Sequence, residues 1–244
     1  MEKYSETYEV RTYECDSEKR LGLLPLFNLM QAMATKHANI IGVGYDVLAE
    51  KGCYWVYTAY DIKILRRPTW LEKIVMTTWP SNSTALTCFR EIQMSDEKGT
   101  PLVNASCQFA VLDMKRHRPV PVERVFSDSY QPIQERLVDT TFPKLPELTH
   151  IDAQKEIPVR YEDIDVNQHV NNAVYPVVAI EALPFDFLKT HEMSEIKIAF
   201  KKSAVYGDVM VSKAAFDGDV TTHSIVAGDD GREFTRIQMT WNEK

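Results

Sequence analysis

Three residue types that suit hydrolysis follow one another at a spacing of two in the stretch YEDIDVNQHVNNAVY, residues 161–175. They are Asp165, Asn167 and His169. In an extended segment alternate side chains point to the same side, so a carboxylate, an amide and an imidazole converge on one face. An imidazole can exchange a proton with water near neutral pH, and an amide can hold that water or donate to a carbonyl oxygen. The spacing therefore predicts a site where water attacks a carbonyl carbon.

A purely structural interpretation of the same residues stands beside this one. Asp and Asn are ordinary N-caps of helices, and an apolar helix-like run, AVYPVVAIEALP, begins at Ala173. A single His at a helix start is more often structural than catalytic. If the site reading holds, free N–H groups at the helix start would add positive charge near the developing oxyanion.

Other chemistries find no support in the sequence. No HExxH, CxxC or HxxxH pattern is present, and one His offers a single strong ligand, so we expect no metal. The sequence has no Gly-rich phosphate loop and no GxSxG elbow, so we expect no cofactor and no serine nucleophile of that kind. The four Cys residues lie far apart, which favours free thiols.

The chain also repeats itself. VRTYECD begins at Val10 and VRYEDID begins at Val159; IKI begins at Ile62 and again at Ile196. Each copy has one helical pattern followed by several segments rich in β-branched and aromatic residues. A proline-containing, weakly periodic stretch lies between the copies. We therefore expect an N-terminal unit over 1–126, a linker over 127–150 and a C-terminal unit over 151–244, each an α+β layer of one long central helix on an antiparallel sheet.

Composition places the chain in a broad class. It has 244 residues, 44% hydrophobic and 26% charged, as in ordinary soluble globular chains. The net charge of −7 argues against a nucleic-acid partner. No apolar run is long enough to span a membrane, and the polar N-terminus resembles no signal or transit peptide, so a cytoplasmic location is expected.

The motif D-x-D-x-N-x-H-V-N-N-x-x-Y at 163–175, with E-x-x-P at 181–184, resembles the signature of acyl-acyl carrier protein thioesterases. The segments VRTYECDSEKR and NLMQAMATKHANIIGVG, and the series RRPTW then TTW, are similar to the N-terminal half of that family. The resemblance implies a tandem hot-dog fold, with two antiparallel sheets each wrapping a long central helix. It also implies hydrolysis of fatty acyl-acyl carrier protein, which ends fatty acid synthesis.

Within this resemblance, the second unit would be catalytic and the first, which has no Asn-x-His, would hold the acyl chain. An acyl tunnel or a plain core would both suit Met30, Met33, Trp55, Met76 and Trp79. The family usually has an acidic residue in the strand after the helix, often followed by Cys. In this sequence Ser203 and Ala204 stand there. Ser203 and Glu181 are therefore only auxiliary candidates, and Glu181 also suits a structural role.

Acyl carrier protein is acidic, so a basic docking face is expected despite the net charge. The candidates are Arg66, Arg67, Lys115, Arg116, Arg118, Lys201 and Lys202. A homodimer is a further expectation. Three alternatives stay open at this point: an acyl-CoA thioesterase, another hot-dog enzyme such as a dehydratase, and a non-enzymatic acyl-binding module, the last favoured by the loss at Ser203.

Overall fold

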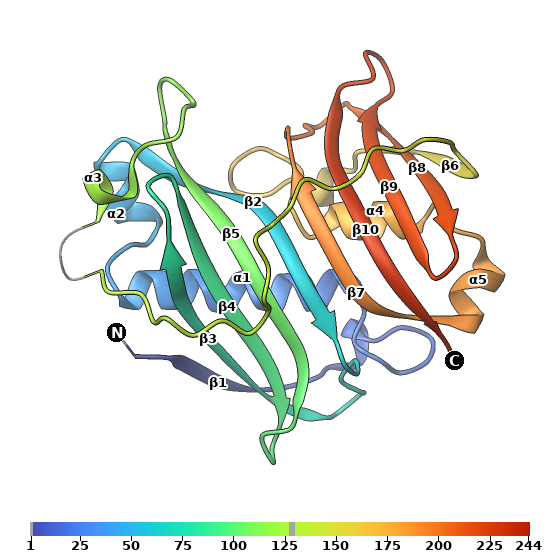
Figure 1. Cartoon of the computed structure of the whole chain (residues 1–244), viewed down its shortest axis with the longest axis horizontal. Coiled ribbons are helices and arrows are strands. Elements are labelled where there is room, and N and C mark those ends of the chain that lie inside the picture. Colours follow the sequence, from blue (N-terminus) through green and yellow to red (C-terminus); the bar gives the residue numbers. More distant parts are fainter. Residues whose placement is uncertain (1, 127–129) are drawn as a thin grey trace. The chain divides into compact units, whose positions relative to one another are not determined.

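A computed structural model describes residues 2–126 and 130–244, which divide into two compact units, Met1–Phe142 and Pro143–Lys244 (Figure 1). Unit 1 contains β1 (Tyr4–Glu9), η1 (Thr12–Glu14), α1 (Leu23–Ile40), α2 (Tyr45–Glu50), β2 (Cys53–Ile64), β3 (Lys73–Ser83), β4 (Thr87–Asp96), β5 (Pro101–Asp113) and α3 (Val122–Val125). Unit 2 contains β6 (Ala153–Pro158), η2 (Tyr161–Asp163), α4 (Val174–Ile180), α5 (Phe185–Thr190), β7 (His191–Phe200), β8 (Val209–Asp217), β9 (Val220–Ala227) and β10 (Glu233–Glu243).

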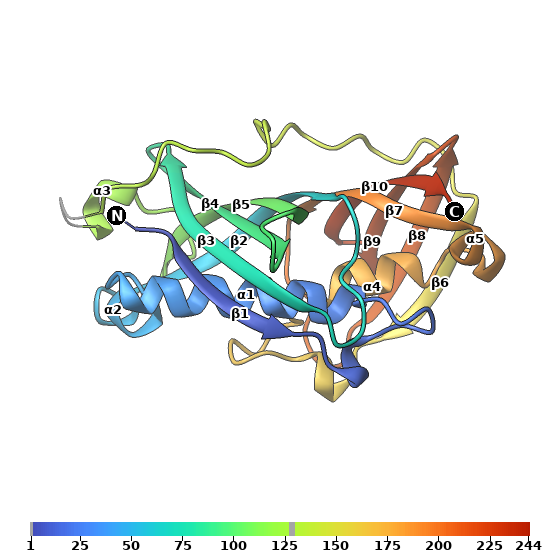
Figure 2. The same ribbon diagram turned by 90° about the horizontal axis from the view of Figure 1, so that it is seen from below.

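The sheet of unit 1 has the strand order β1-β3-β4-β5-β2, with antiparallel neighbours throughout. Helix α1 lies against one face of this sheet, over β3 and β4 (Figure 2). Its buried residues are Leu26, Phe27, Met30, Met33, Ala34 and His37, spaced by three or four as expected for one face of an amphipathic helix. Burial of that face holds the helix on the sheet.

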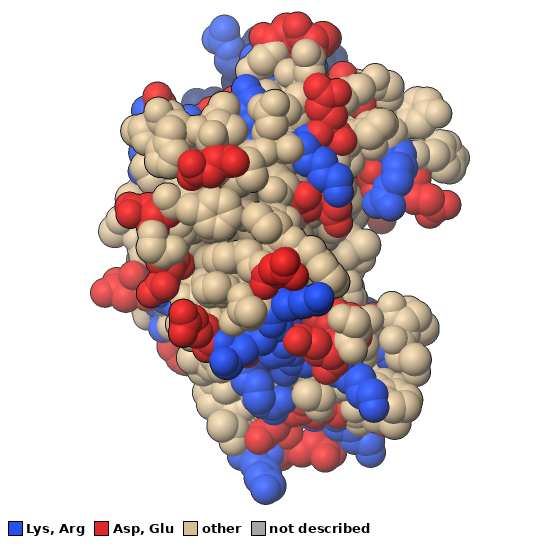
Figure 3. Space-filling model, turned by 90° about the vertical axis from the view of Figure 1, so that its right-hand side faces the viewer, with Lys and Arg blue, Asp and Glu red and all other residues tan. Residues whose placement is uncertain are grey.

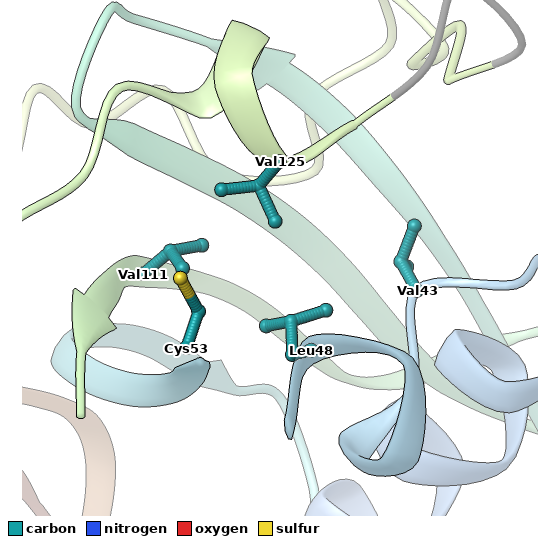
Figure 4. Packing of buried hydrophobic residues seen from close by; sticks show 5 residues of the cluster. All are labelled: Val43, Leu48, Cys53, Val111 and Val125. Carbon is teal, nitrogen blue, oxygen red and sulfur yellow. The ribbon is translucent and has the colours of Figure 1, made fainter. Parts of the chain in front are cut away.

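A small apolar cluster closes one end of unit 1. Val43, Leu48 and Cys53 meet Val111 and Val125 there (Figure 4). The cluster fixes α2 and α3 against the ends of β2 and β5, so the loop after α1 is anchored by packing.

The opposite face of this sheet is covered by residues 130–142, which contain no helix or strand (Figure 2). Ile133 donates its N–H to the Pro80 carbonyl, and the Trp79 indole donates to the Glu135 carbonyl at 3.0 Å. Leu137 donates its N–H to the Glu91 carboxylate at 3.0 Å. We call this segment the strap. Of the predicted linker over 127–150, residues 127–129 lie outside the described residues, and the strap belongs to unit 1.

The sheet of unit 2 has the order β6-β8-β9-β10-β7, which is the order of unit 1 with each strand replaced by its counterpart. Helix α4 packs on β8 and β9, as α1 packs on β3 and β4. The two IKI triplets lie in the equivalent strands β2 and β7. The internal repeat is thus structural, and the tandem hot-dog arrangement is confirmed.

The long helix predicted for unit 2 is wrong in its length. Its run is divided into α4, seven residues, and α5, six residues, whereas α1 has eighteen. Pro176 is tolerated because it lies in the first turn of α4. Pro184 disfavours helical geometry at Leu183, so the helix ends before it and α5 starts afresh.

Two buried histidines predict a pH-dependent stability. His37 is 2% exposed and His223 is fully buried. Burial lowers the pKa of each imidazole from about 6.5 to about 4. The unfolded chain therefore binds more protons than the folded chain between these values, so stability falls as pH drops from about 6.5 towards 4. We expect the free energy of unfolding in urea to fall by up to roughly 1.4 kcal/mol per pH unit for each histidine.

Measurement between pH 6.5 and 5.5 separates the histidines from Glu72 and Glu233, because these two carboxylates, whose pKa lies near 2, lose their stabilising contribution only as the pH falls below about 5. His223→Gln should remove about half of the slope. His117→Asn, at an exposed turn, is the matched control and should leave the slope unchanged. A flat profile in the parent protein would contradict the assignment.

Candidate active site

The predicted residues Asp165, Asn167 and His169 lie in one tight loop between η2 and α4. The loop is closed by the Asp165 N–H donating to the His169 carbonyl at 2.8 Å and by Gln168 donating to the Asp165 carbonyl at 3.0 Å. Gln168 has a φ of 63°, a left-handed conformation that single turn residues can adopt. The loop is therefore a defined turn with its side chains presented outward.

The Asp165 carboxylate organises this loop. One oxygen accepts the backbone N–H of Asn167 at 2.8 Å and that of His169 at 3.4 Å. The other accepts the side-chain amide of Asn167 at 3.4 Å. Asp165 therefore orients Asn167 directly, and the amide keeps a second N–H and its oxygen for other partners.

The His169 ring is exposed and makes no hydrogen bond within the described ranges 2–126 and 130–244. The structure places His169 on the same turn as Asp165 and Asn167, but the His169 ring forms no hydrogen bond with either residue. An exposed imidazole next to an oriented amide is accessible to water and to a substrate carbonyl.

Unit 1 contains the same turn with different side chains. Asp16 accepts the N–H groups of Glu18 and Arg20 at 2.9 and 3.0 Å, as Asp165 accepts those of Asn167 and His169. Lys19, the counterpart of Gln168, has a φ of 60°. The backbone of the turn is thus common to both units, and only unit 2 places an amide and an imidazole on it.

Residue 203 corresponds to a residue that contacts the turn in unit 1. The Val170 N–H donates to the Ala204 carbonyl at 2.9 Å, just as the Leu21 N–H donates to the Pro68 carbonyl in unit 1. In unit 1 the residue before Pro68, Arg67, pairs with Asp16 at 2.7 Å. Ser203 holds the corresponding position and is exposed. Among the residues that the structure describes, no cation pairs with Asp165 as Arg67 pairs with Asp16, and Ser203 supplies no carboxylate.

One contact of this region was missed from the sequence. Tyr175 of α4 is 1% exposed, and its hydroxyl oxygen accepts the Ala204 N–H at 2.9 Å. The sequence signal was a tyrosine in an otherwise apolar helical run, because a buried hydroxyl needs a partner. Tyr175 thus ties α4 to Ala204, which in turn holds Val170 at the end of the turn.

This link is confined to unit 2. The residues at the matching places in unit 1 are Leu26, which is fully buried, and Pro68, which has no N–H. Burial raises the pKa of Tyr175 to about 12, with smaller contributions from the Asp208 and Asp165 carboxylates. The hydroxyl is therefore neutral at physiological pH and close enough to Asp165 to interact electrostatically.

We expect Tyr175→Phe to leave the buried Ala204 N–H without an acceptor and to reduce stability by about 1–3 kcal/mol. Because the link holds the turn, kcat for the proposed hydrolysis should fall while KM changes little. Urea unfolding and steady-state kinetics would measure the two effects. Phe187→Leu, in α5, is a control that removes ring packing without touching the turn. An unchanged kcat in Tyr175→Phe would contradict a positioning role.

Glu181, the other auxiliary candidate, contacts a residue outside the turn. It pairs with Lys155 at 2.6 Å, and both side chains are about half exposed. This contact suits the structural interpretation.

Helix α4 begins one residue later than the apolar run suggested. It starts at Val174, whose N–H donates to the Asn171 carbonyl, while the Ala173 N–H donates to the Asn171 side chain. The N–H groups of Ala173 and Val174 are therefore both engaged by Asn171.

The described residues contain no cluster of side chains typical of a metal site and no helix typical of a membrane span. Among them no three or more His, Cys, Asp or Glu side chains gather in a way that could hold a metal ion. None of the helices described is both long and apolar enough to cross a lipid bilayer.

The proposed lining residues of unit 1 divide into two groups. Met30, Met33, Met76 and Trp79 are at most 3% exposed and form core. Trp55 lines a cavity of about 100 Å³. Four of the five residues are thus part of the hydrophobic core, which agrees with the structural interpretation of this group.

Comparison with known proteins agrees with this geometry. The model of the acyl-ACP thioesterase N-terminal domain matches residues 1–130, and that of the C-terminal domain matches residues 147–243. A palmitoyl-acyl carrier protein thioesterase of Cuphea hookeriana chloroplasts is 26% identical over 99% of this chain, which spans 62% of that relative's length.

Two solved structures share the fold. The 12:0-ACP thioesterase from Umbellularia californica superposes with a TM-score of 0.89 at 21% identity, covering 99% of this chain and 98% of the other. An acyl-ACP thioesterase from Bacteroides thetaiotaomicron gives 0.89 at 19% identity, covering 98% of each chain. With both family models matched along nearly its whole length, the chain belongs to the acyl-ACP thioesterase family.

Proposed function

We propose that this protein hydrolyses the thioester of fatty acyl-acyl carrier protein, releasing a free fatty acid and the carrier with its free thiol. The observation that carries the proposal is the turn at Asp165, where a carboxylate holds an amide beside an exposed imidazole. The unit 1 turn has the same backbone but carries Glu18 and Arg20 instead. Family membership supplies the substrate class.

In the proposed reaction, His169 accepts a proton from a water molecule whose oxygen attacks the thioester carbon. The Asn167 amide donates to the carbonyl oxygen as it gains negative charge. The C–S bond then breaks, and the proton held by His169 passes to the departing thiolate. Asp165 keeps the amide oriented throughout, so the two groups that touch the substrate are Asn167 and His169.

Because residue 203 is a serine, Asp165 supplies the carboxylate of the turn. Asp208, further along the same segment, is engaged by the Val205 N–H at 3.0 Å and lies 3.5 Å from Arg232. We therefore assign it a structural role, and the site works with Asp165, Asn167 and His169.

One assay tests the activity against the alternatives. Purified protein is given acyl carrier protein charged with chains of several lengths, and the matching acyl-CoAs, and free thiol is measured. Release from the carrier protein at higher kcat/KM than from CoA is the expected result. Preference for CoA would favour an acyl-CoA thioesterase. No release from any donor would favour the acyl-binding module, which the serine at residue 203 supports.

Three of the candidate docking residues are already engaged in ion pairs. Arg66 pairs with Glu72 at 2.6 Å, Arg67 pairs with Asp16, and Lys201 pairs with Glu233. On the face drawn in Figure 3, Lys and Arg side chains lie among Asp and Glu side chains, so the charges there are mixed. Lys115, Arg116 and Arg118 all lie exposed on the turn after β5, and Lys202 is exposed beside Ser203. The β5 turn is therefore the best docking candidate in unit 1.

We expect the triple change Lys115→Glu, Arg116→Glu and Arg118→Glu to raise KM for acyl-acyl carrier protein roughly tenfold, because charge complementarity mainly sets the rate of encounter. Hydrolysis of a small acyl N-acetylcysteamine thioester should be unchanged. The parent activity should also fall with added salt. Lys98→Glu, on the turn after β4, is the matched control. Equal KM values for the triple variant and the parent would exclude this turn.

Two other expectations stay predictions. A homodimer would appear as twice the chain mass in sedimentation or light scattering. The cytoplasmic location would be tested by fractionating cells that express the protein.

A further inference from the structure

A cleft of about 500 Å³ lies within unit 2. Its floor is the face of the sheet opposite α4, since Ser212 of β8 donates to the Ala179 carbonyl of α4 and the adjacent Lys213 therefore points to the other face. Residues 147–151, which contain no helix or strand, lie over this face (Figures 1 and 2), and we call them the cover. The lining residues all lie between 147 and 236, so one unit contains the whole cleft.

Three polar residues form a row across the floor. Lys213 of β8 lies opposite Ser224 of β9, and Ser224 lies opposite Arg236 of β10. Neighbouring strands are about 4.8 Å apart, so the backbones of Lys213 and Arg236 lie roughly 10 Å apart and their long side chains can reach one ion above Ser224. The residues of unit 1 in the same register are uncharged: Thr77, Gln93 and Asn104.

Both cations of this row keep N–H groups for a ligand. Lys213 is half-buried, and within residues 2–126 and 130–244 no carboxylate pairs with it. Arg236 is 5% exposed and donates three of its five N–H groups, two to the Glu233 carboxylate and one to the Leu145 carbonyl. Its further contact in those ranges is an ion pair with Glu147 of the cover at 3.5 Å.

The charges around the cleft do not balance. Four Lys and Arg side chains line it or pair with its lining residues: Lys144, Lys201, Lys213 and Arg236. Three carboxylates do so: Glu147, Asp152 and Glu233. Each of the three is paired with another of these cations or with His150, so the unmatched positive charge is that of Lys213. A partly buried cation without a counter-charge favours the binding of an anion.

The rest of the lining is largely apolar, with Leu148 and Ile151 from the cover and Val226 from β9. Apolar walls with a few convergent polar groups are typical of sites for small organic molecules, and the volume suits such a ligand. We propose that the cleft binds a small organic anion. Its carboxylate or phosphate head lies between Lys213 and Arg236, and its apolar part contacts the three apolar residues. The turn at Asp165 does not line the cleft, so the proposal does not depend on the proposed hydrolysis.

The Glu147 carboxylate competes with this ligand for Arg236. It lies 3.5 Å from the guanidinium, at the place where the head of the ligand would approach. The Glu147 side chain is 68% exposed, so it is free to turn into water when the ligand binds. Removal of its charge should therefore strengthen binding, whereas removal of the Lys213 charge should weaken it.

Isothermal titration calorimetry with hexanoate, hexyl phosphate, inorganic phosphate and 1-hexanol tests the site. We expect at least one of the two alkyl anions to bind more tightly than inorganic phosphate and 1-hexanol, and the tighter of the two identifies the head. Lys213→Thr, which introduces the residue type of the unit 1 row, should raise its Kd roughly 10-fold or more. Glu147→Gln should lower that Kd roughly threefold. Lys155→Thr is the matched control, because Lys155 pairs with Glu181 outside the cleft, and should leave the Kd unchanged.

Several results would overturn the proposal. They are no heat of binding with either alkyl anion, equal affinity for 1-hexanol, or equal affinity for inorganic phosphate, which would show an adventitious ion only. A Kd that is the same in Lys213→Thr and the parent would place the ligand elsewhere, the candidate active site included. The urea unfolding midpoint of Lys213→Thr shows whether its fold is intact. If that variant does not fold, the gain of affinity in Glu147→Gln decides, and an unchanged Kd there overturns the site.

Discussion

His169→Ala should lower kcat/KM for acyl-acyl carrier protein by about 10²- to 10⁴-fold, the range that loss of a general base produces. The loss should lie mainly in kcat, because the imidazole acts on water and makes no contact that holds the acyl chain. The turn itself should persist, since it is held by Asp165 and by backbone hydrogen bonds to which the imidazole ring contributes nothing. Free thiol release under saturating donor measures the effect.

The repeat provides a matched control for this experiment. Arg20→Ala removes the side chain at the same place of the unit 1 turn, and we expect it to retain most of the activity. Asn167→Ala and Glu18→Ala form a second such pair, with a loss of about 10²- to 10³-fold expected only for the first. If His169→Ala kept full activity while its fold was intact, the site assignment would have to be abandoned.

Glu91→Leu should destabilise unit 1 by about 3–5 kcal/mol, because it leaves a cation and several donors without their acceptor. Glu91 is fully buried and accepts from Ser81 at 2.6 Å, from Ser106, and from the Leu137 N–H at 3.0 Å. Arg136 Nε lies 2.8 Å away as an ion pair, although its N–H does not point along a hydrogen bond. This one carboxylate therefore anchors the strap to the sheet.

Two measurements would show the loss. Urea unfolding should report the reduced stability, and limited proteolysis should cut residues 133–138 faster in the variant. Glu181→Leu is the matched control, because its half-exposed pair with Lys155 should contribute less than about 1 kcal/mol. Adding Arg136→Leu to Glu91→Leu should restore part of the stability, since the cation is then no longer left alone. An unaltered unfolding curve for Glu91→Leu would show that the strap is held by other contacts.

The sequence predicted the features that have short-range signals. The repeat, the strands and the first helix follow from periodicity, and Asp165, Asn167 and His169 share one turn because they are near neighbours along the chain. Contacts between distant residues had no such signal. Tyr175 and Ala204 meet only after the sheet has formed, and the same is true of Glu91 and Leu137. Pro184 is a helix-ending signal in the sequence, but the apolar run on both sides of it favoured the prediction of one continuous helix.

The difference between Tyr175 with Ala204 and Leu26 with Pro68 constrains how two copies of a duplicated unit can diverge. Replacing Pro68 alone would introduce a buried N–H that has no acceptor. Replacing Tyr175 alone would leave the Ala204 N–H without its acceptor. Both changes give the same mixed state, an apolar residue facing an unpaired N–H, which is less stable than either end state, so a change at one position favours a change at the other. Pairs of this kind make substitutions conditional on one another, and they would appear as covarying columns when many such chains are aligned.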